Sequence, residues 1–170
     1  MLAGKKERKL FGISEFEHGI ASRLILSTGR FELRKFPELP IEPKPDLLAL
    51  AGPIRAPERH CFVLFPPLNE QVVWIKVRRL GTMSEIAALA EWLLAHREVN
   101  KVAILTSGFH LPRVRLCCRF LLPKNVGAWF LSVPDEKIPL GSRVLEWIKH
   151  VAYLAALNTA RVKSPKANCR

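Results

Sequence analysis

The sequence predicts an α/β fold in which helices cover a mostly parallel sheet. The run from Val102 to Leu105 is uniformly apolar, which is typical of a strand buried on both faces of such a sheet. A polar corner follows it, and Pro112 then favours a helix start, because proline is well tolerated in a first helical turn. With 170 residues, 49% of them hydrophobic, the chain is large enough for one domain with its own core.

The other elements follow from apolar spacing and from turn residues. Apolar residues recur at helical spacing in three segments, and β-rich or continuous apolar runs mark the strands. Gly19 makes a suitable helix stop. We expect helices over residues 5–18, 82–97 and 141–160, a further helix from His110 or Leu111, strands over 23–26, 102–105 and 128–133, and a hairpin of 61–65 and 72–77 with its turn at Pro66 and Pro67.

The terminal helix has two chemically different sides. Apolar residues such as Leu145, Ile148 and Val151 share one side, while Glu146 and Lys149 gather on the other. We expect the apolar side to dock on the sheet. Residues 1–160 are then one domain, and residues 161–170 are a basic flexible tail.

Residues 36–60 differ in composition from the rest. Six prolines punctuate this segment, which we interpret as an insertion that covers one edge of the sheet. Either a passive connection or a lid fits the pattern. Asp46 is expected to cap a short helix that ends at Gly52.

Charge and cysteine usage narrow the setting. The net charge is +12, and residues 161–170 hold four basic residues and no acid. A solvated end explains such a tail, and attraction to an anionic membrane or to nucleic acid is the alternative. Charge alone supports nucleic-acid binding, since the sequence has no recognised motif for it, and we do not expect a nucleic-acid partner. The four cysteines have no metal-binding spacing and suit a reducing compartment. Without an apolar leader or spanning run, we expect a cytoplasmic protein or one peripheral to the inner membrane.

The candidate site follows the strand at 102–105. In open α/β sheets, ligands bind outside the carboxyl ends of the strands, where helix N-termini favour anions. Thr106 and Ser107 supply hydroxyls there, and His110 and Arg113 share one face of the next helix start. Arg113 suits a phosphate clamp, with His110 as general acid or additional donor. The competing interpretation is that the hydroxyls only satisfy backbone groups.

Three ordered stretches carry a resemblance to a known family. They are ILSTG, GTMSEIAALAEWL and LTSGFHLPRVRL, the last of which contains Thr-Ser-x-x-His-x-x-Arg. Together they resemble the SanA/YdcF/ElyC family of bacterial envelope-associated domains, over roughly Lys9 to Leu157. The resemblance implies a Rossmann-like three-layer sandwich. The family opens with an additional apolar strand and a glycine pair, so we expect this chain to be N-terminally truncated.

The resemblance also extends the candidate site to the other two stretches. Thr28 stands where the family has a glycine, and Ser84 stands where it has an acid, with Glu85 one place later. The pattern T-M-S-E is also a capping box, so Glu85 either caps its helix or contacts a ligand. We predict His110 and Ser107 as catalytic residues, no metal ligands, and a ligand-binding set of Ser27, Thr28, Gly29, Thr82, Glu85, Thr106, Gly108 and Arg113.

The function that these residues favour is binding of a phosphorylated or nucleotide-like small molecule. The resemblance implies a role in cell-envelope metabolism, with peptidoglycan precursors or lipid carriers as the substrate class. A hydrolase or transferase and a non-catalytic ligand-binding or regulatory module are both open, and the cofactor is unknown. Serine-hydrolase chemistry is disfavoured, because Ser107 lacks a G-x-S-x-G elbow and its acid partner is not identified.

Overall fold

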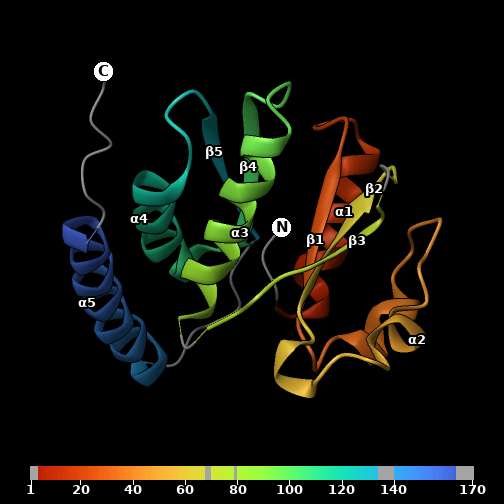
Figure 1. Cartoon of the computed structure of the whole chain (residues 1–170), viewed down its shortest axis with the longest axis horizontal. Coiled ribbons are helices and arrows are strands. Elements are labelled where there is room, and N and C mark those ends of the chain that lie inside the picture. Colours follow the sequence, from red (N-terminus) through yellow and green to blue (C-terminus); the bar gives the residue numbers. More distant parts are fainter. Residues whose placement is uncertain (1–3, 68–69, 79, 134–139, 164–170) are drawn as a thin grey trace.

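The computed structural model describes residues 4–67, 70–78, 80–133 and 140–163. Helices and strands are mixed along the chain, as the sequence predicts (Figure 1). Short 3₁₀ helices η1, η2 and η3 interrupt the connections. In order, the elements are α1 (Lys6–Glu17), β1 (Leu24–Thr28), η1 (Leu33–Glu38), α2 (Leu47–Ala51), η2 (Ala56–Glu58), β2 (Cys61–Phe65), β3 (Val72–Trp74), α3 (Gly81–Ala95), β4 (Lys101–Ser107), η3 (Gly108–His110), α4 (Leu111–Leu121), β5 (Gly127–Val133) and α5 (Leu140–Lys163).

The strands of the described residues form two sheets rather than one. β1, β2 and β3 make an antiparallel sheet in that order, with Ile25 opposite Leu64 and Phe62 opposite Val73. β4 and β5 make a separate parallel pair. The predicted hairpin is therefore confirmed as β2 and β3. The expectation of a mostly parallel sheet is met by β4 and β5 only, because β1 pairs with the hairpin in the opposite sense.

Helices connect the two sheets through three apolar clusters. Alternate residues of β2 point to opposite faces, so that Val63 packs with Ile13 of α1 while Leu64 packs toward Leu89 of α3. The third cluster joins α3, β4, α4 and α5 around Ile86. Helix α1 contacts both β1 and β4. The relative positions of the two sheets are thus fixed by α1 and α3, which each contact both.

The proline-rich segment folds onto the antiparallel sheet. Phe36, Leu39 and Leu47 are buried in the same cluster as β1 and β2. Helix α2 begins as predicted, since the Asp46 carboxylate accepts hydrogen bonds from the amides of Leu48 and Ala49. Helix α2 ends at the predicted Gly52.

The predicted capping box at the start of α3 is wrong. The helix begins at Gly81, and Leu80 occupies the N-cap position without a side-chain hydrogen bond to the helix. Thr82 is therefore already inside the first turn. Glu85 is buried and points away from the helix end, toward β1.

The predicted docking side of α5 is also wrong. Helix α5 packs on α4 through Tyr153 and Leu157, and it lies at the outer edge of the molecule (Figure 1). The apolar residues Leu145, Ile148 and Val151 are exposed, whereas Glu146 is half-buried. Partners on α4 explain the reversal, because Arg113 there pairs with Glu146 and fixes the rotation of α5. No helix in the described part of the chain is both long and apolar enough to cross a bilayer.

Candidate functional site

The carboxyl ends of β1 and β4 meet at one turn of α1. Arg8 donates a hydrogen bond from Nη2 to Oγ of Ser107 at 2.8 Å. Its neighbour Lys9 donates from Nζ to Oγ1 of Thr28 at 3.2 Å. Both basic side chains are buried, although they lie on a helix rich in exposed charge. Two predicted hydroxyl residues from distant parts of the chain therefore face consecutive cations.

Lys9 also forms an ion pair with Glu32. The distance from Nζ to Oε2 is 2.6 Å, and the Lys9 side chain is 4% exposed. A buried ammonium needs such a partner, because an unpaired charge away from water is costly. Glu32 thereby neutralises Lys9, and Arg8 beside it donates to the hydroxyl of Ser107.

Ser27, His60 and Glu85 form a compact buried triangle. Ser27 Oγ donates to Glu85 Oε1 at 2.6 Å, and His60 Nε2 lies 3.0 Å from the same oxygen. Ser27 Oγ and His60 Nε2 are 2.9 Å apart. Gly29 lies beside the His60 ring, since a Cβ on it would stand 3.6 Å from the ring atoms. The structure thus joins Ser27, Gly29 and Glu85, which the sequence predicted separately, and adds His60.

This triangle does not have the geometry of a hydrolase triad. In a triad, the serine and the acid contact opposite nitrogens of the imidazole, so that a proton can pass through the ring. Here, Ser27 and Glu85 both approach Nε2 of His60. The arrangement instead holds the end of β1 against α3 and against the segment between η2 and β2 that carries His60. Glu85 is the common partner of Ser27 and His60.

A second cluster joins the start of α4 to α5. Glu146 accepts a hydrogen bond from Arg113 Nη1 and another from Lys149 at 2.9 Å. His110 Nδ1 lies 3.1 Å from Glu146 Oε2 and 3.2 Å from Arg113 Nη2. The Arg113 guanidinium also lies over the Tyr153 ring, 5.3 Å from its centroid. Arg113 therefore positions Glu146 and is less available as a phosphate clamp than its sequence position suggests.

Burial lowers the pKa of His110, and the charges of Arg113 and Arg8 act in the same direction. Hydrogen bonding to Glu146 partly offsets this effect. The ring is accordingly neutral near pH 7, and Nδ1 has one role at a time. It donates to Glu146 when it carries the proton, or it accepts from Arg113 when it does not. The first tautomer leaves Nε2 as a base that a carboxylate orients.

The pKa of Glu146 is about 2, below its usual value of 4.5. Burial alone would raise it, but hydrogen bonds from Arg113, Lys149 and His110 outweigh that effect. Glu146 is thus a permanent anion at neutral pH. Sequence reasoning left it without a place, because His110 and Arg113 lie far from it in the sequence.

The remaining predicted residues lie near these clusters without forming them. Thr106 is buried within β4, Gly108 begins η3, and Thr82 lies one turn before Glu85. Arg8 links the turn of α1 to the cluster around Glu146. It donates a hydrogen bond to Ser107, and its charge acts on His110. The Ser107 hydroxyl is contacted by this cation and not by a base in the described residues.

Thiol and metal chemistry receive no support from the described residues. Cys61, Cys117 and Cys118 are buried free thiols, and burial raises the pKa of each to about 12. Such thiols are protonated and poor nucleophiles. No group of three or more His, Cys, Asp or Glu side chains is arranged to hold a metal ion within the described segments.

Comparisons with known proteins add nothing to this site: no family model, curated protein or solved structure matches the chain.

Proposed function

We propose that this protein binds a phosphate-bearing small molecule where β1 and β4 end against α1. The observation that carries the proposal is the contact of Arg8 and Lys9 with hydroxyls from two separate strand ends. Guanidinium, ammonium and hydroxyl groups are the donors that phosphate oxygens accept best. A phosphate oxygen is a stronger acceptor for a guanidinium donor than the hydroxyl of Ser107 is.

His110 is the residue that would act as a general acid or base at this site. A neutral imidazole oriented by Glu146 can accept or deliver a proton, which suits a hydrolase or transferase acting on a phosphate ester. Without such a step, the same donors make a ligand-binding or regulatory module. Turnover therefore separates the two alternatives, and binding is common to both.

The biological setting of the proposal rests on sequence resemblance. The three ordered stretches support a SanA/YdcF/ElyC-like domain of Rossmann-like three-layer type that acts on peptidoglycan precursors or lipid carriers in the bacterial envelope.

Arg8→Met is expected to weaken phosphate binding by about tenfold or more, because it removes a charge-assisted hydrogen bond from a buried site. Isothermal titration with pyrophosphate, uridine diphosphate and a polyprenyl phosphate measures this effect. Arg97→Met is the control: it makes the same change at an exposed position between α3 and β4, and it should bind as the wild type does. Equal affinities of Arg8→Met and wild type for every ligand would overturn the proposal.

The exposed side of α5 supports a second function, peripheral binding to an anionic membrane. Trp147 is 74% exposed and Ile148 is 62% exposed, and Val151 and Leu154 continue the same side of the helix. The sequence that follows carries four basic residues and no acid between residues 161 and 170. An apolar helix face next to basic residues is the pattern by which amphipathic helices lie on anionic bilayers.

Trp147→Ser is expected to reduce binding to phosphatidylglycerol vesicles several-fold, because the indole is the largest exposed apolar group on α5. Sedimentation with vesicles of this lipid and of phosphatidylcholine measures the effect. Phe31→Ser, which removes an exposed aromatic ring between β1 and η1, should leave binding unchanged. Equal sedimentation with both lipids, or no sedimentation, would rule out this function.

A further inference from the structure

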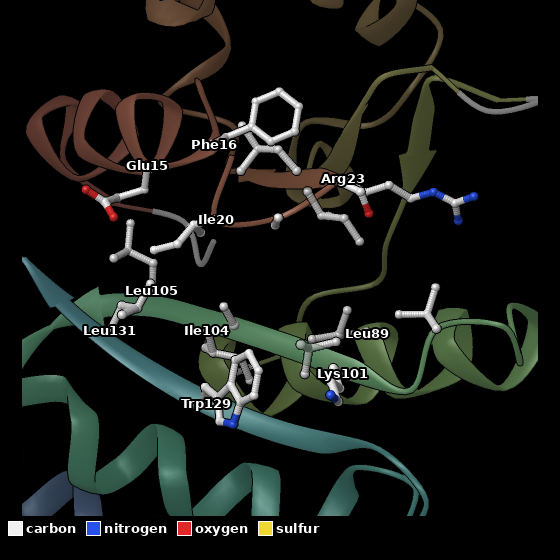
Figure 2. A pocket seen from close by; sticks show the side chains of 18 of the residues that line it. Glu15, Phe16, Ile20, Arg23, Leu89, Lys101, Ile104, Leu105, Trp129 and Leu131 are labelled. Atoms are coloured by element: carbon white, nitrogen blue, oxygen red, sulfur yellow. The ribbon is translucent and has the colours of Figure 1, made fainter. Parts of the chain in front are cut away.

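A cavity of about 540 Å³ separates the two sheets. β1 lies on one side of it and β4 on the other, while α1 and α3 close the remaining two sides. Figure 2 shows side chains from Phe16 and Ile20 on one side, and from Leu89, Ile104 and Trp129 on the other, facing each other across this space. The cavity thus has two strands as its edges and two helices as its faces.

The edge that β4 presents to the cavity carries backbone hydrogen-bonding groups. β4 pairs with β5 on one side only, and residues 101–105 line the cavity with the other side. In a parallel ladder, the N–H and C=O groups of a strand alternate between its two sides. No backbone hydrogen bond of the described residues leaves β4 on the cavity side. A strand edge whose backbone groups have no partner strand is a template for another strand.

The lining of the cavity is apolar in its interior and charged at its ends. In Figure 2, Ile104, Leu105 and Leu131 lie along its length, whereas Glu15 stands at one end and Arg23 and Lys101 stand at the other. Ala103 in the middle of β4 is exposed, although the strand was predicted to be buried on both faces. An added strand would lie beside this residue in the plane of the β4–β5 sheet, between α1 and α3.

We propose that this cavity binds an extended apolar segment of another polypeptide, which pairs with β4 as an additional strand. The backbone edge identifies the occupant, because a lipid or other hydrocarbon ligand would leave those N–H and C=O groups without partners. The five lining residues of β4 correspond to about 16 Å of strand. Since helices lie on both faces, the segment is apolar on both faces and free of proline.

A second copy of this chain is a poorer occupant. Among the described residues, the apolar extended runs already belong to β1–β5, so a second copy has no such segment to donate without unfolding. Its exposed apolar residues lie mainly on helices, above all on α5. A segment from a different polypeptide meets the requirement without that cost.

A synthetic peptide tests the proposal on the intact protein. The probe is acetyl-KVIVIVK-amide, in which lysines at both ends provide solubility. We expect saturable one-to-one binding by titration calorimetry and slower amide hydrogen exchange at residues 102–105. The control peptide has the same side chains with N-methyl groups on alternate residues, which removes backbone donors. It should bind about tenfold more weakly or less. Equal binding of both peptides would show an apolar pocket rather than strand pairing and would overturn the proposal.

A variant of β4 tests the location. Ala103→Trp places a large ring at an exposed position in the cavity lining, and it should weaken peptide binding by about tenfold or more. Ala56→Trp makes the same change at an exposed position in η2 and should bind normally. Absence of peptide binding by the wild type, or unchanged binding by Ala103→Trp, would refute the assignment. The phosphate experiment does not depend on either result.

Discussion

Replacing Arg113 with methionine is expected to lower the free energy of unfolding by about 3 to 5 kcal/mol, the cost typical of removing one partner from a buried ion pair. Arg113 and Glu146 are 10% and 11% exposed, so the carboxylate left behind is largely shielded from water. Lys149 remains as its partner, but its side chain is 44% exposed and is a weaker substitute. Urea denaturation at pH 7, followed by circular dichroism, measures the change.

Two further variants distinguish loss of the pair from loss of packing. Arg119→Met changes an exposed arginine of the same helix and should leave stability nearly unchanged. Adding Glu146→Leu to Arg113→Met should recover much of the loss, because the unpaired carboxylate is then gone. If the double variant is as unstable as the single one, the packing of Arg113 against Tyr153, and not its charge, holds α4 to α5.

The same pair sets how stability changes with pH. The pKa of Glu146 is about 2 in the folded protein and close to 4.5 when unfolded, so its ion pairs stabilise the fold fully above pH 4.5. This contribution is lost as the pH falls toward 2, because the unfolded chain then binds the proton more readily. In Arg113→Met, the pKa of Glu146 rises, and the loss of stability between pH 4.5 and 2 should become smaller.

Local signals in the sequence predicted the elements well. The apolar run of β4, the Asp46 cap of α2 and the hairpin of β2 and β3 depend on residues that are close together in the chain. The polar corner after β4 was also visible, because hydroxyl, glycine and proline residues mark the end of a strand and the start of a helix. Ser107, His110 and Arg113 were therefore found as a group.

The partners of these residues were not predictable, because they come from elements distant in sequence. Arg8 and Lys9 lie among exposed charges on α1, and only the packing of α1 on β1 and β4 reveals their burial. His60 precedes β2 and carries no motif of its own. No spacing rule distinguishes Arg8 and Lys9 from the exposed basic residues of the same helix, so their burial was not predictable from the sequence.

The reversed orientation of α5 has a related cause. Periodicity identifies the two sides of a helix but not the surface that each side contacts, and the larger apolar side was assumed to face the core. In the structure, Arg113 draws Glu146 inward, which turns Ile148 and Val151 outward. The sheet arrangement escaped prediction for the same reason, since the sense in which β1 pairs depends on contacts with β2.

Glu85 matches a local capping pattern but has a tertiary role in the structure. Its spacing from Thr82 matches a capping box, yet it accepts a hydrogen bond from Ser27 at the end of β1. We expect Glu85→Leu to lower the free energy of unfolding by about 2 to 4 kcal/mol, because hydrogen bonds to a buried charged acceptor each contribute about 1.5 to 3 kcal/mol and leave unsatisfied partners when removed. Thermal and urea denaturation measure this loss.

The control for this prediction lies on the same helix. Glu91→Leu replaces an exposed glutamate of α3 and should change stability by no more than about 0.5 kcal/mol. Glu85→Gln retains an acceptor oxygen for Ser27 and should fall between the wild type and Glu85→Leu. If all three variants are equally stable, the triangle with His60 is not structural.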